Sequence, residues 1–253
     1  MKHIRKSQPE PAELANYRER FAAAPRPPTW SEFKADFRRR EPVKARLRQD
    51  QRNLCAYYEN SLIPQDESVE HFLAKSSPAG RPRQLDWSNL LLCCGGGEKP
   101  LPEDVDDAAV RFEGNGERTC GHAKLANPAA ILNPLQLPPT PRLFQFSSEN
   151  GAIHPDVAGC RAAGVEVALV ENTITVLNLR AGRLNRARHA LLWELRSQLD
   201  VDGAAPAITT ERASEIAAQQ IPATGALPAF FTTIRWVLGQ GAETHLQAVG
   251  FIG

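Results

Sequence analysis

An acid and a histidine stand side by side within the short stretch Ser68–Lys75, and hydrophobic residues flank them. Histidine is the side chain that most readily takes up a proton near neutral pH. The adjacent Glu70 can hold a divalent metal while His71 prepares a water molecule to attack phosphorus. The stretch therefore favours a metal-dependent nuclease centre. An acid–histidine pair on the surface, without chemical function, is the simpler alternative.

Cysteines surround this pair in the sequence. Cys55 lies upstream, Cys93 and Cys94 follow, and Cys120 comes later, within a total of five cysteines. The basic N-terminus is not followed by an apolar run, and nothing approaches the roughly 18 apolar residues that a membrane helix needs. We therefore expect a cytoplasmic protein without a membrane span. In such a protein the odd number of thiols favours metal binding or free cysteines over disulfides.

The balance of charge limits how the chain can contact nucleic acid. A formal net charge of +1 excludes a strongly basic protein, so any phosphate-binding surface must be a local patch. Basic side chains are concentrated between residues 34 and 52, where they can line a phosphate backbone. Acidic residues are interspersed among them, so an ordinary solvated helix face is the equal alternative. The basic row comprises Lys34, Arg38, Arg39, Arg40, Lys44, Arg46, Arg48 and Arg52.

The spacing of apolar residues predicts mostly short elements. Three helices are expected before residue 54: over residues 11–23, around residues 30–37, and over residues 42–53. Residues 54–58 and 61–63 are typical of two short strands that form a hairpin. The apolar run 87–93 is expected to be a helix, and the stretch 95–116, rich in glycine and acidic residues, a surface insertion.

The C-terminal half is predicted to be mainly helical. Residues 143–146 indicate a strand, and helices are expected over residues 156–163 and 183–199, after residue 209, and over residues 230–238. The whole is an α+β fold in three regions: an N-terminal helical region (1–53), a core (54–127) and a mainly helical C-terminal region (128–253). The last region carries no recognisable chemistry and is predicted to be a scaffold or a partner surface.

The order of the motifs in the core is that of a ββα-metal fold. The chain resembles an HNH endonuclease and, more narrowly, the HNH nuclease subunit of Septu-type anti-phage systems, which is also found beside some retrons. The most specific stretches are Val69–Phe72, Leu85–Cys94 and Thr119–Lys124, and weaker similarity covers most of the chain. The resemblance implies a metal-dependent endonuclease that acts in anti-phage defence.

The resemblance also implies a role for each matching residue. His71 matches the general base, Glu70 the acidic neighbour that helps to hold the metal, and Asn89 the central asparagine that orients the loop carrying the base. His122 is the candidate second metal ligand, and Lys124 is an alternative that would instead contact the scissile phosphate. Magnesium or manganese suits such an oxygen-rich site with open positions for phosphate oxygens.

Related nucleases often carry a structural zinc held by a Cys-x-x-Cys knuckle and two later cysteines. Here Tyr58 stands where the second cysteine of the knuckle would be. The remaining candidate zinc ligands are Cys55, Cys94 and Cys120. Cys93 or His122 is a candidate fourth ligand, because structural zinc needs four. Reduced cysteines packed as small apolar groups are the alternative.

Two functions from different classes follow. The first is a hydrolase that cuts nucleic acid, DNA before RNA, together with the ATPase subunit that accompanies this family. The second is a catalytically degenerate HNH fold that binds nucleic acid or docks a partner without cutting it. The missing knuckle thiolate supports the second function, whereas the retention of Glu70, His71 and Asn89 supports the first. An α+β module whose long C-terminal helices dock an ATPase is a third alternative, and it is compatible with the first function.

Overall fold

A pair of antiparallel strands, β1 (Glu67–His71) and β2 (Leu90–Cys94), occupies the centre of the N-terminal half. The computed structural model describes residues 1–98, 100–101, 108–112, 117–124, 130–199 and 209–253. The register places His71 opposite Leu90 and Glu67 opposite Cys94. Every residue of β2 is buried, because α3 and α5 both contact this strand.

The prediction of a helix over residues 87–93 is wrong. Trp87–Asn89 form a single 3-10 turn, and the leucines and cysteines that follow are β2. A short apolar run is compatible with a buried strand as well as with a buried helix, and here the pairing with β1 decides.

The prediction of a hairpin of two strands over residues 54–63 is also wrong. Only one bridge joins its two arms, between Leu54 and Ser61, and the residues between them form a tight loop. Arg52, Asn53 and Glu59 all have positive φ, which a regular strand does not allow. The amide of Ala56 instead donates to the Leu92 carbonyl, so the loop is fastened to β2.

Three helices cover the N-terminal end: α1 (Ala12–Arg20), α2 (Trp30–Lys34) and α3 (Phe37–Asp50). Thr29 and Glu32 form a capping box at α2, and Asp36 caps α3 by accepting from the Arg38 amide. This second cap explains why the residues expected to form one helix around 30–37 are divided between two. It also explains why α3 begins at Phe37, well before the predicted start at residue 42.

The C-terminal half contains a second strand pair, β3 (Phe144–Phe146) with β4 (Ile153–Pro155). Short helices α4 (Ala108–Arg111) and α5 (Cys120–Lys124) precede it. The helices that follow are α6 (Val157–Ala163), α7 (Val167–Val176), α8 (Gly182–Leu199), α9 (Thr210–Gln220) and α10 (Phe231–Ala248). The strand and the helices expected here are confirmed, although α10 continues past residue 238 through a kink at Gly239.

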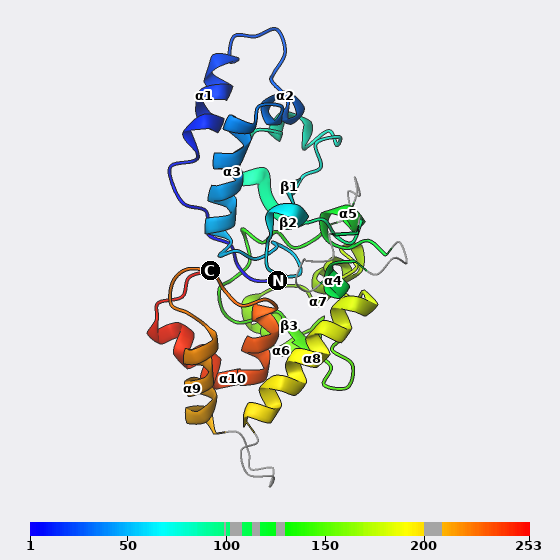
Figure 1. Cartoon of the computed structure of the whole chain (residues 1–253), viewed down its shortest axis with the longest axis vertical. Coiled ribbons are helices and arrows are strands. Elements are labelled where there is room, and N and C mark those ends of the chain that lie inside the picture. The colour runs from blue at the N-terminus through cyan, green and yellow to red at the C-terminus, as the bar shows by residue number, and fades with distance from the viewer. Residues whose placement is uncertain (99, 102–107, 113–116, 125–129, 200–208) are drawn as a thin grey trace.

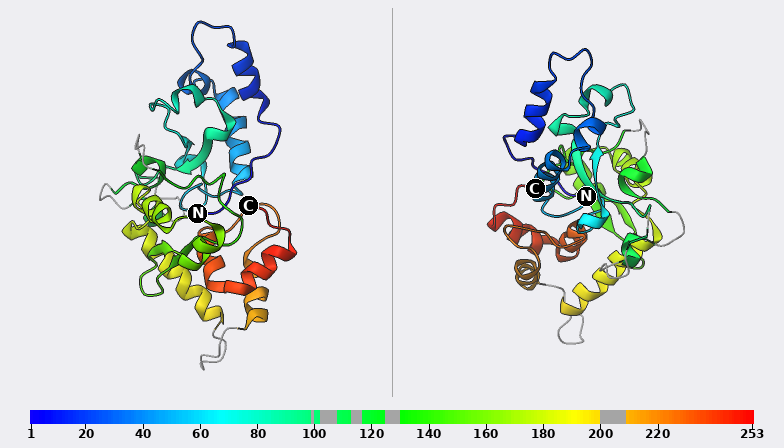
Figure 2. Two further views of the ribbon diagram at one scale, coloured as in Figure 1. Left: turned by 180° about the vertical axis from the view of Figure 1, so that it is seen from behind. Right: turned by 45° about the horizontal axis from the view of Figure 1, so that its top comes forward.

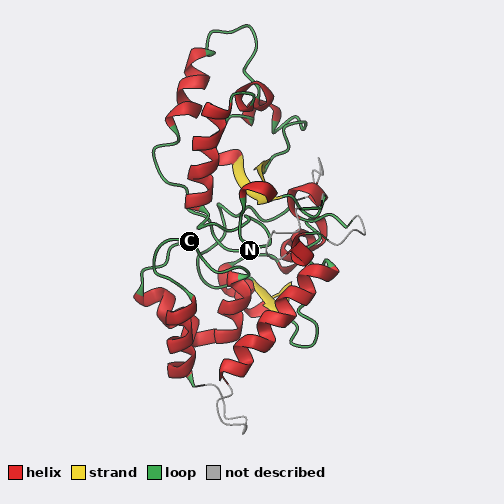
Figure 3. Cartoon of the chain, viewed as in Figure 1, coloured by secondary structure: helices red, strands yellow, loops and turns green. Residues whose placement is uncertain are grey.

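The elements stack along one long axis, with α1 to α3 at one end and α8 to α10 at the other (Figure 1). Both termini lie near the middle of that axis, and the views from other sides agree (Figure 2). Helices dominate and the strands are few and short, as an α+β fold allows (Figure 3). Residues 99, 102–107 and 113–116 of the expected insertion lie outside the described residues, as does the predicted boundary at 127–128.

One hydrophobic cluster runs from Met1 and Ile4 through β2 to α7 and the start of α8. A second cluster joins the end of α8 to α9 and α10, and Leu54 belongs to it. Strand β2 therefore lies within the first cluster, and Leu54 joins the neighbouring 54–63 loop to the second. Among the described residues, none of the helices has the length and the apolar character needed to cross a membrane.

Candidate active site

His71 ends β1 and is 5% exposed. Its Nε2 lies 2.9 Å from the carbonyl oxygen of Gln84, and its ring lies 5.5 Å from the Trp30 ring in an edge-on arrangement. A carbonyl only accepts, so Nε2 carries the hydrogen and Nδ1 keeps its lone pair. The contact with Gln84 therefore leaves Nδ1 as the atom that can take up a proton.

Burial lowers the pKa of His71 from 6.5 to about 4. The hydrogen bond to Gln84 opposes this shift, and the nearby positive charges of Lys75, Lys124 and Lys34 reinforce it. The imidazole is consequently neutral at pH 7, which is the state that a general base requires.

Asn89 holds the loop between β1 and β2 closed on itself. Its buried amide Nδ2 donates to the carbonyls of Leu73 and Arg83, both at 3.1 Å, and its Oδ1 accepts from the Leu73 amide at 2.7 Å. Arg83 directly precedes Gln84, whose carbonyl holds His71. The side chain of Asn89 thus ties together both ends of the loop that orients the imidazole.

Lys6 supports this arrangement from the N-terminal segment. Its Nζ donates to the carbonyls of Trp87 and Leu90, on either side of Asn89, and lies 3.7 Å from the centre of the Trp87 ring. Burial lowers the pKa of Lys6 to about 7. This role of Lys6 could not be predicted from the sequence, because a lysine in a basic N-terminus is ordinarily solvated.

The pKa of Lys6 gives a testable dependence of stability on pH. The unfolded lysine keeps its proton up to about pH 10.5 and the folded one only to about pH 7. The unfolded state therefore binds more protons between these values, and the free energy of unfolding rises with pH there. We expect the stability of the parent relative to Lys6→Met to increase by roughly 3 kcal/mol from pH 7 to pH 10. Chemical denaturation of both proteins at pH 7 and pH 10 measures this difference in the free energy of unfolding. A difference that is the same at both pH values would contradict the prediction.

Glu70 lies against the first turn of α5. A Cβ added at Gly121 would come within 2.5 Å of its Oε2, so the glycine allows the close approach. Lys124 pairs with the Glu70 carboxylate and donates to the carbonyls of His71 and Phe72, both at 2.8 Å. This ammonium is 4% exposed. Lys124 therefore fastens α5 to the end of β1, and its predicted contact with a phosphate remains a prediction.

His122 is placed differently from the other candidates. Its Nδ1 lies 2.9 Å from Oε2 of Glu98, and the imidazole is partly exposed. Its chain neighbour Gly121 touches Glu70, so the two candidate metal ligands come from adjoining segments. A carboxylate and an imidazole are suitable donors for a catalytic divalent ion. In this structure each is engaged by another side chain, Glu70 by Lys124 and His122 by Glu98.

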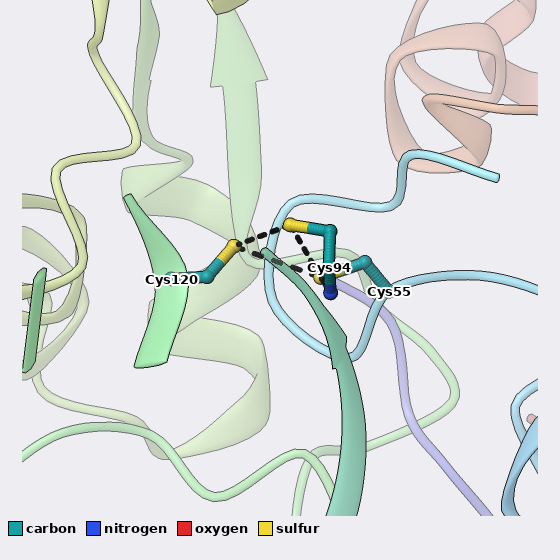
Figure 4. Close-up of side chains that lie close together, drawn as sticks. All are labelled: Cys55, Cys94 and Cys120. Carbon is teal, nitrogen blue, oxygen red and sulfur yellow. Dashed lines mark hydrogen bonds between the residues drawn. The ribbon is translucent and has the colours of Figure 1, made fainter. Parts of the chain in front are cut away.

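The sulfurs of Cys55, Cys94 and Cys120 form a nearly equilateral triangle (Figure 4). The three Sγ–Sγ distances are 3.7 Å (Cys55 to Cys94), 3.6 Å (Cys55 to Cys120) and 3.6 Å (Cys94 to Cys120). Zinc–sulfur bonds of about 2.3 Å in a tetrahedron place neighbouring sulfurs about 3.8 Å apart. The three thiols therefore fit one face of a tetrahedral zinc site.

The electrostatics of the cluster agree with this fit. Burial favours the neutral thiol, but hydrogen bonds from Cys120, Cys93 and Cys94 outweigh it and lower the pKa of Cys55 well below its usual value. Burial raises the pKa of Cys94 and Cys120. One thiolate among neutral thiols is a group that a cation would stabilise, and metal ligation requires deprotonated sulfur.

The structure does not bring a fourth cysteine or histidine into this group. Cys93 and His122 do not join the cluster, although Cys93 is near enough to affect Cys55. Tyr58, at the position of the missing knuckle thiol, is buried beside the cluster. Its burial is the main cause that raises the pKa of the phenol, and the nearby Cys94 is the second cause. In the described part of the chain, these cysteines are the one group of three or more histidine, cysteine or acidic ligand atoms close enough to share an ion.

No family model matches the chain. A protein of Escherichia coli named "Retron Ec83 putative HNH endonuclease" is 32% identical over 197 residues, which cover 67% of this chain and 72% of the relative.

Proposed function

The chain belongs to the HNH endonuclease family, and from this premise we propose that it hydrolyses phosphodiester bonds of nucleic acid with His71 as the general base. The observation that carries the proposal is the environment of His71. Its Nε2 is occupied by the Gln84 carbonyl, its Nδ1 is left to accept a proton, and its low pKa keeps it neutral. These are the properties of a base poised to activate water.

In the proposed reaction, Nδ1 of His71 takes a proton from a water molecule as that water attacks phosphorus. The bond from phosphorus to the water oxygen forms, and the bond to the sugar oxygen of the leaving strand breaks. The hydrogen bond from Nε2 to Gln84 keeps the imidazole from turning during the transfer. Asn89 acts as a positioning residue, because it holds the loop that carries this carbonyl.

Glu70 and His122 are the proposed ligands of a magnesium or manganese ion. Such an ion would supply positive charge to the phosphate oxygens. Lys124, which pairs with Glu70, would keep the carboxylate directed toward α5 and hold the end of β1 in place. The thiols of Cys55, Cys94 and Cys120 would supply three of the four ligands of a structural zinc that fastens the 54–63 loop to β2 and α5.

We also propose that the enzyme acts in anti-phage defence with an ATPase partner. The name of the relative associates that protein with a retron. The defence role and the ATPase partner rest on the resemblance of this chain to the HNH subunit of Septu-type systems. The C-terminal half is the proposed docking region. The Septu-type affiliation remains a prediction of the resemblance.

A second candidate function is binding without cutting. Its support is that both proposed ligands of the catalytic metal are already paired, Glu70 with Lys124 and His122 with Glu98. If these pairs persist, the ion has no site and the fold serves only to bind nucleic acid or a partner.

Incubation with plasmid, linear duplex, single-stranded DNA and transfer RNA separates the two functions. Each substrate is tested with magnesium, with manganese and with chelator, in the presence and absence of the ATPase and nucleotide. The enzyme is expected to cut at least one substrate only when the metal is present. Binding without cutting in every combination would favour the second function.

A further inference from the structure

Most of the basic side chains between residues 34 and 52 are engaged by carboxylates or carbonyls of the fold, so few of them are left free for a phosphate backbone. Lys44 and Arg48 both pair with Glu67, and Arg52 donates to two backbone carbonyls near residue 225. Arg39, Arg40 and Arg46 are likewise held by nearby carboxylates or carbonyls. Among the described residues, Lys34 and Arg38 are the members of the row that are exposed and have no carboxylate partner.

The first of these free cations, Lys34, ends the helix whose first residue contacts the candidate base. Trp30 contacts the His71 ring, and Lys34 follows it by four residues on α2, so the two side chains emerge on the same side of the helix. Trp30 is buried, whereas Lys34 is exposed to solvent. The charge of Lys34 reaches His71 and contributes to its lowered pKa.

An exposed aromatic ring stands between the two cations in the sequence. Phe37 begins α3 and is 63% exposed, and the Arg40 guanidinium lies 5.4 Å from the centre of its ring. Asp36, the acid between them, caps α3 and also pairs with Arg39, so its charge is already compensated. A large apolar ring kept in water at this place has no partner in the core.

We propose that Lys34, Phe37 and Arg38, here called the Phe37 platform, bind single-stranded nucleic acid beside His71. Phe37 would stack on an unpaired base, and Lys34 and Arg38 would contact the phosphates on either side of it. Successive bases stacked on aromatic rings along a basic track are the usual means of holding single strands. The inference rests on the proposed function and names its substrate class.

The same chemistry argues against a duplex as the preferred ligand. Within a duplex the faces of the bases are covered by their neighbours, so an aromatic ring can stack only at an end. Two free cations also neutralise few phosphates, whereas duplex binding draws most of its affinity from many such contacts. A single strand or an unpaired loop offers exposed base faces to the ring of Phe37 and needs only a few phosphate contacts.

Binding without cleavage tests the proposal. End-labelled oligonucleotides of DNA and of RNA, as single strands and as blunt duplexes, are titrated with the full chain in chelator, and anisotropy gives Kd. Phe37→Ala is expected to weaken single-strand binding about 5- to 100-fold and to change duplex binding less than about twofold. Phe37→Trp is expected to retain binding. Lys34→Ala and Arg38→Ala should each lower the salt dependence of binding by about one phosphate contact.

Trp193→Ala is the matched control, because it removes an equally exposed aromatic ring from α8 in the other half of the chain. Single-strand binding should survive this change. The proposal is overturned if the parent binds duplex as tightly as single strands, or if Phe37→Ala binds single strands like the parent. A parent that binds single strands but never cuts would contradict the proposed nuclease and leave the platform intact. The DNA and RNA arms identify which nucleic acid is preferred.

Discussion

Replacing His71 by alanine is expected to lower the rate of nucleic-acid hydrolysis by about 10²- to 10⁴-fold, the usual contribution of a general base. The imidazole is the one group on β1 with a free nitrogen lone pair, and its pKa of about 4 keeps that lone pair available at neutral pH. The rate is measured at saturating enzyme, so that weaker binding cannot imitate a slower chemical step.

His154→Ala is the matched control for this prediction. His154 lies on β4 and is partly paired with Arg180, away from the β1–β2 loop. Its loss should leave the rate within about twofold of the parent. Similar losses in both variants would show that the effect of His71→Ala is not specific to the proposed base.

The second large effect concerns the cysteine triangle. The purified chain is expected to contain close to one equivalent of zinc, and Cys120→Ser to lose it together with at least about 3 kcal/mol of stability. The reason is geometric: the three sulfurs already stand at the spacing of a tetrahedral face, and Cys120 comes from α5 while the other two come from the 54–63 loop and β2. Without the metal these segments lose their common anchor.

Cys160→Ser is the control for the triangle. Cys160 is as buried as the cluster cysteines but lies on α6, where its sulfur donates to the Leu143 carbonyl. Its replacement should keep the zinc and cost no more than about 1 kcal/mol. Less than about half an equivalent of zinc in the parent, or equal losses in both variants, would favour thiols that pack as small apolar groups.

The sequence indicated which residues form the candidate site better than it indicated the hydrogen bonds that hold them. The order of Cys55, Glu70-His71 and Asn89 could be read from spacing and resemblance. In the structure the sulfurs of Cys55, Cys94 and Cys120 lie close together. The carbonyl of Gln84 could not be foreseen, because every residue carries a backbone carbonyl and only the folded loop selects one.

Contacts between segments that are distant in the sequence explain where the predictions of structure and of a phosphate surface differ from the fold. The run Leu90–Cys94 has no periodicity that separates a strand from a helix, so its pairing with β1 had to come from the structure. The basic row could be interpreted as a phosphate-binding surface because the acid that engages Lys44 and Arg48 lies far from them in sequence. Glu67 shows why that was misleading: it comes from β1 and binds two of these cations at once.

Chemical rescue of His71→Ala tests the central claim most directly. The variant is incubated with single-stranded substrate and metal while free imidazole is added in increasing amounts. If His71 is the base, the variant is nearly inactive alone and imidazole restores cleavage in proportion to its neutral form, whereas His154→Ala shows no such dependence. Cleavage by His71→Ala at the parent's rate without imidazole would contradict the assignment of His71 as the general base.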